Sequence, residues 1–520
     1  MRHIRLTGRF APASFVVPAF GLSRGFMISA AMSAAACSPE PAPTQPSVSV
    51  SGPDTGGEAI LASAVGRPNI VVIMSDDQTV EEMRVMTQTR SLIGSAGMTF
   101  RNNVVTYALC CPSRSTFLTG QYPHNHGVRS NGGTDGGYDK LDHTNTLPVW
   151  LQQAGYVTGH IGKYLNGYGE VDSLMIPPGY TEWYASLGQS AYNYYDYKVN
   201  QNGTVVSHGS SPDEYQSDFY TRNAVDFIGR RGRTAAAGGE PFFLFVTYLA
   251  PHWGGPVEAG DPTTLKSAVP APRHKGHFAG EVLPKSPAFN EADMSDKPAS
   301  MRSRPLLTSL QKSDLQKAYQ QRLESLLAVD EGVGRIIQAL QDVGVLQNTL
   351  VIYTSDNGWF QGEHRIGFGK ILPYEPAVKV PLLIRGPGIS MGGRNWAAVA
   401  NVDLAPTIVA TAGATPGRIM DGRSLWPLLQ GQSSWGTPPG RYVMVEDSPL
   451  GGPASVFWSI RQGKYVYTEY ANGNRELYDL GVDSAEVASR HADPAYTAIR
   501  RRLADHLAAM KACAGPTSCW

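Results

Sequence analysis

Three long apolar runs constrain the fold of this chain more than any other feature of its sequence. Each run is rich in Val, Ile, Leu or Phe and ends in polar residues, and they occupy residues 69–77, 242–252 and 349–357. A strand that is apolar on both faces belongs in a sheet that helices cover on both sides. The sequence therefore predicts an α/β fold, with polar side chains gathered where these strands end.

A long helix is predicted between the second and third runs. Residues 313–343 repeat apolar side chains at helical spacing, for example at Leu315, Tyr319 and Leu323. Ser313 occupies the predicted N-cap position, and Gly344 follows the predicted end. This helix is one of those expected to cover the sheet.

The pattern changes after about residue 400. Residues 441–447, 455–461 and 464–470 are typical of short strands, with Gly463 at a turn between two of them. A last helix is predicted over residues 494–511. We therefore expect a smaller C-terminal antiparallel sheet with one helix, packed on the large domain.

The N-terminal segment has the pattern of an export signal. Arginines precede a short apolar run over residues 26–36, which ends in A-A-A-C at Cys37 and is too short to span a bilayer. A cysteine at this point is typical of a bacterial lipoprotein signal, and ordinary cleavage beyond Cys37 is the alternative. The chain is therefore predicted to be exported, as a periplasmic, cell-surface or secreted protein, with a lipid anchor as its one predicted attachment to a membrane.

These patterns divide the chain into four predicted segments. Residues 1–37 form the export signal, and the proline-rich residues 38–66 form a linker that buries little apolar surface. Residues 67–400 form the large domain, and residues 401–520 form the C-terminal subdomain.

The balance of charge excludes one class of partner. Lysine plus arginine and aspartate plus glutamate both total 44, so the formal net charge is zero. A nucleic-acid-binding protein is expected to carry a basic excess. We therefore predict no nucleic-acid partner, although a local pocket for one small anion is compatible with this composition.

Acidic side chains follow two of the three apolar runs. Asp76 and Asp77 end the first run, and Asp356 and Asn357 end the third. If both strands lie centrally in one sheet, three carboxylates meet and repel each other unless a cation neutralises them. All-oxygen ligation selects Ca²⁺ or Mg²⁺ over Zn²⁺. The alternative is that these residues cap helices that follow the strands.

Two of the five cysteines are adjacent, at Cys110 and Cys111, directly before Pro112. Their adjacency excludes a C-x-x-C metal or redox motif and disfavours a disulfide between them. A pair of inert core thiols is the ordinary interpretation. However, Pro112 suits the first turn of a helix, which places both cysteines at a helix N-terminus, where an anion is favoured.

The stretch C-C-P-S-R over residues 110–114, followed by L-T-G, resembles the signature of the type I sulfatases. Further motifs appear in the order of that family: D-D-Q at 76–78, G-K at 162–163, A-P-H at 250–252, D-N-G at 356–358 and G-K at 369–370. H-N-H at 124–126, G-K-Y-L-N at 162–166 and P-P-G-Y-T-E-W at 177–183 resemble the branch of N-acetylglucosamine-6-sulfatases and heparan endosulfatases. The resemblance implies the alkaline-phosphatase-like fold, a large mixed sheet between helices.

The resemblance also implies a set of site residues. A maturation enzyme would oxidise Cys110 to formylglycine, whose hydrate attacks sulfur with one hydroxyl and releases sulfate through the other. The implied ligands of a Ca²⁺ ion, preferred over Mg²⁺, are Asp76, Asp77, position 110, Asp356 and Asn357. The implied catalytic residues are Arg114, which holds position 110, Lys163 and Lys370, which neutralise the sulfate, and His252, which protonates the leaving alcohol. The implied substrate-binding residues are His124, His126 and Asn166.

The predicted function is hydrolysis of a sulfate ester on a sugar of the glycosaminoglycan type, such as 6-O-sulfated N-acetylglucosamine. One alternative is a phosphonate or phosphate monoester hydrolase of the same superfamily. Another is a polysaccharide-binding lipoprotein in which Cys110 is never converted. Tyr192, Tyr194 and Tyr195 are compatible with stacking on a sugar or with core packing, and Cys513 and Cys519 are predicted to form a disulfide.

Overall fold

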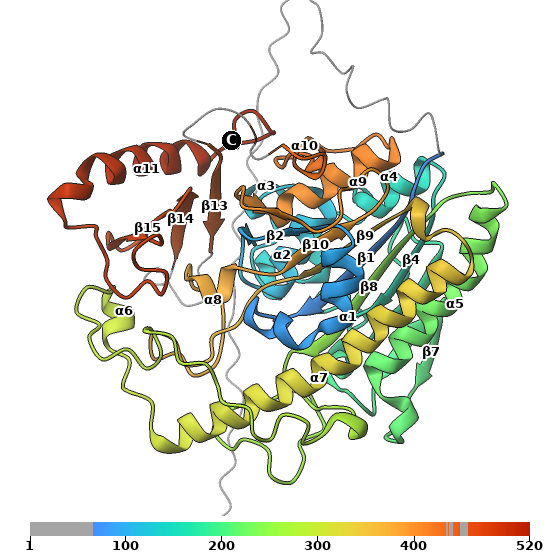
Figure 1. The fold of residues 1–520 in the computed structure, drawn as a ribbon, viewed down its shortest axis with the longest axis horizontal. Coiled ribbons are helices and arrows are strands. Elements are labelled where there is room, and N and C mark those ends of the chain that lie inside the picture. Colours follow the sequence, from blue (N-terminus) through green and yellow to red (C-terminus); the bar gives the residue numbers. More distant parts are fainter. Residues whose placement is uncertain (1–65, 433–434, 436–439, 448–455) are drawn as a thin grey trace, which may run out of the picture. The chain divides into compact units, whose positions relative to one another are not determined.

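The computed structural model describes residues 66–520 except 433–434, 436–439 and 448–455. The predicted export signal, Cys37 and nearly all of the predicted linker lie outside these residues. The described chain contains a ten-stranded mixed sheet in the order β11-β2-β10-β9-β1-β8-β4-β5-β6-β7 (Figure 1). The predicted α/β class with a large mixed sheet is confirmed.

The three apolar runs form the centre of this sheet. They are β1 (Asn69–Asp76), β8 (Phe242–Pro251) and β9 (Thr349–Ser355), and β1 pairs in parallel with both neighbours. The remaining strands of the sheet are β2 (Met98–Phe100), β4 (Val157–Gly162), β5 (Glu182–Ser186), β6 (Lys198–Gln201), β7 (Thr204–Ser207), β10 (Leu382–Arg385) and β11 (Gly393–Asn395). Two short strands, β3 (Asn103–Val104) and β12 (Val399–Ala400), pair separately.

Helices bury both faces of the central strands. Val71 and Ile73 of β1 pack in one core with α5 (Gln216–Ala236) and α7 (Ser309–Asp342), which run side by side in Figure 1. Ile70 and Val72 pack in a second core with α2 (Cys110–Thr119), α4 (Leu147–Gln153) and α9 (Leu404–Ala412). The shorter helical segments include α1 (Thr87–Thr89), the π-helical η2 (Arg90–Ser95), α3 (Pro123–His126), α6 (Ala299–Arg302), α8 (Glu375–Val378) and α10 (Trp426–Leu429).

The long helix α7 begins earlier than predicted. Its N-cap is Thr308 and not Ser313, because the Thr308 side chain accepts a hydrogen bond from the Gln311 backbone and the Gln311 side chain accepts one from the Thr308 backbone. This reciprocal capping box satisfies two donors at the helix start. The helix ends close to the predicted point, with Val343 as C-cap.

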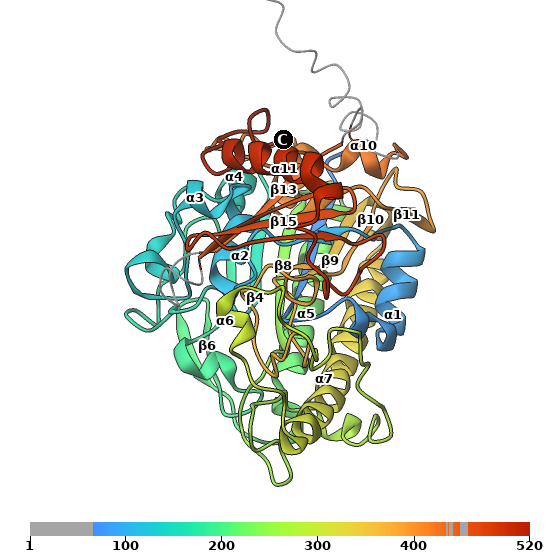
Figure 2. The same ribbon diagram turned by 90° about the vertical axis from the view of Figure 1, so that its left-hand side faces the viewer.

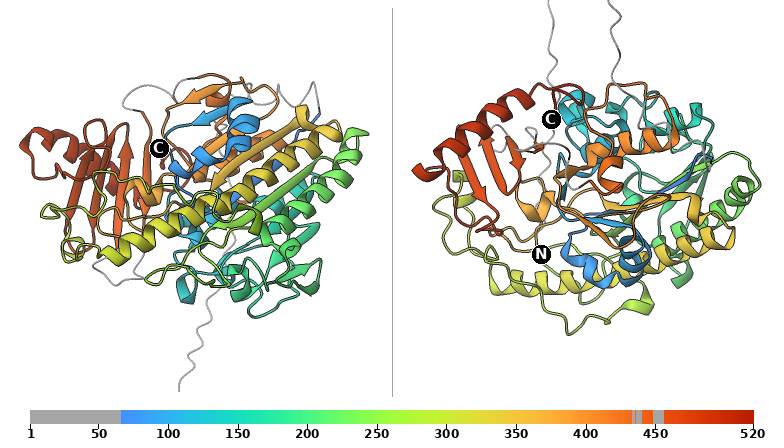
Figure 3. Two further views of the ribbon diagram at one scale, coloured as in Figure 1. Left: turned by 60° about the horizontal axis from the view of Figure 1, so that its bottom comes forward. Right: turned by 45° about the horizontal axis from the view of Figure 1, so that its top comes forward.

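The C-terminal part forms the predicted small antiparallel sheet. Its strands are β13 (Tyr442–Glu446), β14 (Phe457–Gln462), β15 (Tyr465–Tyr470) and β16 (Arg475–Asp479), in sequence order. The last helix, α11 (Thr497–Met510), buries Leu503 and Leu507 in the same core as these strands. Figures 2 and 3 show this sheet and α11, in red, beside the large sheet.

In the described part of the chain, no helix combines the length and the apolar character needed to cross a membrane.

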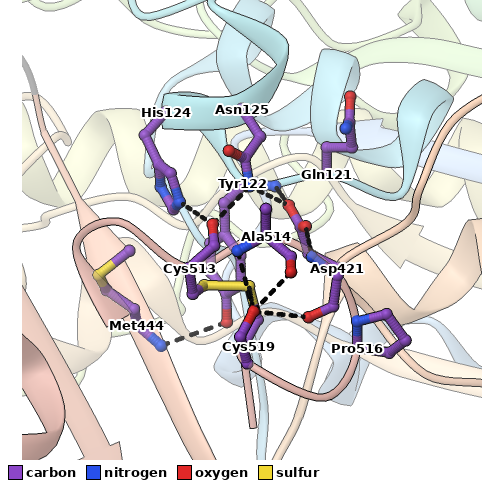
Figure 4. The surroundings of a disulfide bond; sticks show 12 residues. Gln121, Tyr122, His124, Asn125, Asp421, Met444, Cys513, Ala514, Pro516 and Cys519 are labelled. Atoms are coloured by element: carbon purple, nitrogen blue, oxygen red, sulfur yellow. Dashed lines mark hydrogen bonds between the residues drawn. A yellow bond between two sulfur atoms is a disulfide. The ribbon is translucent and has the colours of Figure 1, made fainter. Parts of the chain in front are cut away.

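The predicted disulfide between Cys513 and Cys519 is confirmed, and it follows α11 (Figure 4). Replacing both cysteines by serine is expected to destabilise the fold by about 2 kcal/mol, because the bond closes a short loop in the unfolded chain. We expect the melting temperature to fall by about 3 °C in differential scanning fluorimetry, with activity at 25 °C retained. An unchanged melting temperature would contradict this stabilising role.

Candidate active site

The polar residues after β1 and β9 meet at the carboxyl edge of the sheet. Ser75 and Ser355 are paired in register, so Asp76 and Asp356 leave neighbouring strands at the same level. The backbone N–H of Asp77 donates to Asp356 Oδ1 at 3.1 Å, and Asp77 itself has a left-handed backbone (φ 66°). All three carboxylates are fully buried.

Three cationic side chains balance this buried negative charge. Arg114 of α2 donates from Nη2 to Asp76 Oδ2 at 3.0 Å and from Nε to Asp356 Oδ2 at 2.8 Å. Lys163, which follows β4, pairs with Asp76, and Lys370 pairs with Asp77. The contacting residues are far apart in the sequence, by 293 residues for Asp77 and Lys370, so the cluster forms only when the chain folds.

The buried charges shift the pKa values of the two neighbouring aspartates in opposite directions. For Asp76, burial favours the neutral form, but the positive charges of Lys163 and Arg114 outweigh it and hold the pKa well below its usual range. For Asp77, burial raises the pKa to about 6 against the opposing charge of Lys370. Asp76 is therefore ionised. Around Asp77, the positive charge of Lys370 is too small to outweigh the effect of burial on the pKa.

Cys110 lies at the first position of α2, inside this cluster. Its Sγ is 3.5 Å from Asp76 Oδ1, 2.9 Å from Lys370 Nζ and 3.8 Å from Lys163 Nζ. Burial, assisted by the charge of Asp76, raises the pKa of its thiol to about 12. Cys111 instead belongs to the core between α2 and the sheet, which also contains Phe117 and Leu118. The two cysteines therefore have separate environments.

The same residues fit a hard divalent cation. One ligand atom from each of Asp76, Asp77, Cys110 and His252 lies within 4.8 Å of the others. Among the described residues, no hydrogen-bond partner reaches the buried Asp77 Oδ2 or Asn357 Oδ1, while Asn357 Nδ2 donates to Asp77 Oδ1 at 2.6 Å. Unpartnered buried oxygens carry a large desolvation cost, which a bound cation removes.

His252 follows β8 and faces the acidic cluster with one ring nitrogen. Its Nδ1 is 2.6 Å from the carbonyl oxygen of Trp253, so Nδ1 carries a proton and donates it there. Its Nε2 is 3.5 Å from Asp77 Oδ2. Burial holds the pKa of His252 well below its usual value, so the ring is neutral and Nε2 is free to accept a proton.

A cavity of about 630 Å³ opens beside Lys163. Tyr192 and Trp253 line it as a stacked pair, with ring centroids 5.4 Å apart and an angle of 10° between the rings. Asn166 also lines it: its Nδ2 contacts the Tyr192 hydroxyl, and its buried Oδ1 has no hydrogen-bond partner among the described residues. The cavity thus offers an aromatic wall next to a buried cation.

The other tyrosines of this segment do not reach the cavity. Tyr194 is buried and donates to the His252 carbonyl oxygen at 2.6 Å, and Tyr195 packs in the core with Tyr215. Of the two interpretations that the sequence left open, core packing holds for these two residues.

The structure places His124 and His126 away from this cavity. His124 Nδ1 lies 2.9 Å from Glu446 Oε1, and its Nε2 lies 2.9 Å from the carbonyl oxygen of Cys513 (Figure 4). His126 is buried, with Nε2 3.1 Å from the Thr116 hydroxyl. These contacts join α3 to the C-terminal sheet and to α2, and they bring neither histidine to the site.

One buried residue at the site was missed by the sequence analysis. Arg322 of α7 donates from Nη2 to the Asp77 carbonyl oxygen at 2.7 Å and from Nε to Glu82 at 2.6 Å. It holds the backbone at the left-handed Asp77. The sequence does contain a sign of this role. Arg322 lies three residues after Tyr319, on the apolar stripe of α7, and a charged side chain is rarely buried at such a position without a partner.

Comparisons with known proteins agree with this geometry. A family model described as "Sulfatase" matches residues 68–414, and one described as "N-sulphoglucosamine sulphohydrolase, C-terminal" matches residues 362–513. The chain is 32% identical to an arylsulfatase of Volvox carteri, covering 87% of this chain and 76% of the relative. It is 35% identical to human N-acetylglucosamine-6-sulfatase, covering 72% of this chain and 66% of the relative.

A solved structure with a similar fold is described as a complex with its substrate D-glucosamine-2-N,6-O-disulfate. It has a TM-score of 0.69 and 25% sequence identity, and the match covers 85% of this chain and 97% of the other.

Proposed function

The chain belongs to the sulfatase family and is a sulfuric ester hydrolase, and on that premise we propose that it removes O-sulfate from a sugar of the 6-O-sulfated N-acetylglucosamine type. The observation that carries this proposal is the position of Cys110, which lies buried among carboxylates, two lysines and Arg114 at the floor of the site. Such a site concentrates positive donors where an anionic group must bind.

We propose that Cys110 works only after its conversion to formylglycine by a maturation enzyme. The unconverted thiol is a poor nucleophile here, because burial keeps its pKa at about 12. When present, a hydrated formylglycine supplies two hydroxyls on one carbon, one for attack on sulfur and one for release of sulfate. Arg114 fixes the carboxylates that surround this position.

The residues that would hold a divalent cation are Asp76, Asp77, Asp356, Asn357 and position 110. A cation at this site would polarise the sulfate oxygens and lower the pKa of the attacking hydroxyl. Ca²⁺ is favoured over Mg²⁺, because it accepts a larger shell of protein oxygens at flexible geometry. Lys163 and Lys370, which contact Asp76 and Asp77, would turn toward the sulfate when it binds.

His252 is proposed to protonate the leaving alcohol. Its Nδ1–H is committed to the Trp253 carbonyl, so Nε2 is the nitrogen that faces the site. A bound sulfate ester brings negative charge beside Nε2, which favours the protonated ring and opposes the effect of burial. The proton would then pass from Nε2 to the departing oxygen.

The cavity beside Lys163 suits a sugar ring. The stacked Tyr192 and Trp253 offer an apolar face, and Asn166, whose Oδ1 is buried in this structure, would turn this acceptor toward a sugar hydroxyl or amide N–H when the sugar binds. Replacing Asn166 by alanine is expected to raise KM for N-acetylglucosamine-6-sulfate about tenfold, the cost of one hydrogen bond to a buried polar group. KM for a small aryl sulfate should change little.

Steady-state kinetics on both substrates test this role. Asn223→Ala, on the surface of α5, is the matched control and should leave both KM values unchanged. Equal losses on both substrates would show that Asn166 supports the site as a whole and does not select the sugar.

Two measurements test the proposed function itself. Mass spectrometry of the peptide that contains position 110 should show the aldehyde, and N-acetylglucosamine-6-sulfate should release sulfate faster than a matched aryl sulfate. Faster cleavage of an aryl phosphonate would favour a phosphonate monoester hydrolase. An entirely unconverted Cys110 in exported protein, with no turnover, would favour a polysaccharide-binding protein.

Export and a lipid anchor at Cys37 remain part of this proposal. They are supported by the basic and apolar pattern that ends in A-A-A-C and by the proline-rich stretch that follows it. N-terminal analysis of the mature protein tests the anchor, which requires a mature chain that begins at an acylated Cys37.

A further inference from the structure

A second cavity of about 490 Å³ lies at the other end of the sheet, between η2 and the strands β2, β10 and β11. Three exposed arginines line it, Arg90, Arg101 and Arg394, and the described residues around it include no Asp or Glu. Among the described residues, none of the three forms an ion pair; Arg90 donates only to the backbone carbonyl of Arg84 at 3.2 Å. This contrasts with Arg84, Arg230 and Arg273, which pair with acidic side chains.

The strand register brings these side chains to one face of the sheet. β2 and β11 run parallel, with Arg394 opposite Thr99, and the Arg101 backbone N–H donates to the Asn395 carbonyl at 2.8 Å. Because paired residues of neighbouring strands share a face, Thr99 and Arg394 lie on one face of the sheet, and Arg101, directly after β2, lines the same cavity. Thr99 faces η2: a methyl group on Gly94 would lie 3.1 Å from its hydroxyl oxygen.

Arg90 completes the arrangement from the opposite wall. It is the first residue of η2, which packs over β2 and β10 on the face that Thr99 occupies. Three arginines, from η2, from the end of β2 and from β11, therefore border one cavity. A planar guanidinium group can donate two parallel hydrogen bonds to two oxygens of one sulfate or phosphate group.

An exposed tryptophan follows Arg394 by two residues in the chain. Trp396 is 71% exposed, whereas Trp150, Trp183 and Trp359 are buried. An aromatic ring can pack against the apolar face of a sugar ring. Arginines that form no ion pair with the described residues, together with an exposed indole close in sequence, match the chemistry of a sulfated sugar chain.

We propose that Arg90, Arg101, Arg394 and Trp396 form a second binding surface for a sulfated polysaccharide whose end occupies the active site. The proposal rests on the proposed function, since it assumes that the substrate is a polymer. β2 stands three strands from β1, roughly 15 Å at the usual strand spacing. Val80 and Pro381, on the edge of the sheet that carries the active site, also line this cavity.

Binding at this surface would raise the effective concentration of the next sulfate ester at the active site. The consequence is selective: long sulfated chains gain affinity, and a sulfated monosaccharide, which reaches only the active site, does not. The surface would thus make the enzyme prefer polymer over monomer without any change in the reacting residues.

The test compares the variant R90A/R101A/R394A with the wild-type enzyme. Heparin oligosaccharides of increasing length serve as probes, and N-acetylglucosamine-6-sulfate serves as the small substrate. We expect the dissociation constant for the longest oligosaccharide to rise about tenfold at physiological salt, in line with three exposed charge contacts. Turnover of the monosaccharide should be unchanged.

A matched control removes the same charge elsewhere. R222A/R233A/R501A replaces three exposed arginines that line neither cavity, and it should leave heparin binding unchanged. W396A should weaken binding of heparin but not of a duplex DNA oligonucleotide of equal charge. Circular dichroism and melting temperatures confirm that each variant is folded.

Three outcomes would overturn the proposal: unchanged heparin binding in R90A/R101A/R394A, an equal loss in the control variant, or duplex DNA that binds the surface as tightly as heparin. The proposal would also be overturned if free sulfate bound this surface with the same affinity as the oligosaccharide, because the surface would then be a simple anion site. For the binding measurements, each variant and the reference protein also carry Cys110→Ala, which prevents turnover. The binding result is therefore independent of the test of sulfatase activity.

Discussion

Cys110→Ser is expected to lose turnover by at least about a thousandfold, while the neighbouring Cys111→Ser keeps substantial activity. A serine left unconverted has one hydroxyl, which can attack sulfur but has no second hydroxyl on the same carbon to expel the sulfate. Cys111 lies in the core between α2 and the sheet, so its serine variant changes a packing contact and not the reacting position.

Intact mass measurement of the peptide that carries position 110 distinguishes the two variants. After incubation with substrate, Cys110→Ser should retain one covalently bound sulfate, and Cys111→Ser should retain none. If Cys111→Ser is the inactive variant and Cys110→Ser turns over normally, the assignment of the two cysteines is reversed. If both match the wild type, the formylglycine mechanism does not apply to this chain.

Asp356→Ala is expected to lose the bound divalent cation and about a thousandfold in activity together. Its carboxylate accepts hydrogen bonds from Arg114 Nε and from the Asp77 backbone, so its removal also leaves a buried guanidinium partly unpaired. We therefore expect a lower melting temperature as well, because an uncompensated buried charge is strongly destabilising.

Metal analysis by mass spectrometry and steady-state kinetics measure the two losses. Asp226→Ala is the control, because its carboxylate is largely exposed and pairs with Arg230, far from the acidic cluster in the sequence. It should retain both the metal and the activity. Full activity of wild-type protein after chelation, with no metal detected, would show that the acidic cluster serves another purpose.

Much of the fold followed from local patterns. The central strands were recognisable because a strand buried on both faces must be apolar throughout, and β1, β8 and β9 are fully buried. The small C-terminal sheet was recognisable from its short strands and turn residues. The predicted start of α7 was five residues too late. Both Ser313 and Thr308 are residue types that cap helices, but it is Thr308 that forms a capping box, with the side chain of Gln311.

The sequence by itself determined which residues are predicted to carry the chemistry: the C-C-P-S-R stretch, the acidic strand ends and the ordered G-K and A-P-H motifs. Tertiary structure alone decided which neighbours those residues have. It separated Cys110 from Cys111, directed His124 to Glu446 and the Cys513 carbonyl, and brought Arg322 to Asp77. The physical reason is that the chemical identity and the local propensity of a residue are properties of that residue and its sequence neighbours. Charge balance, burial and pKa instead arise from contacts between segments that are hundreds of residues apart.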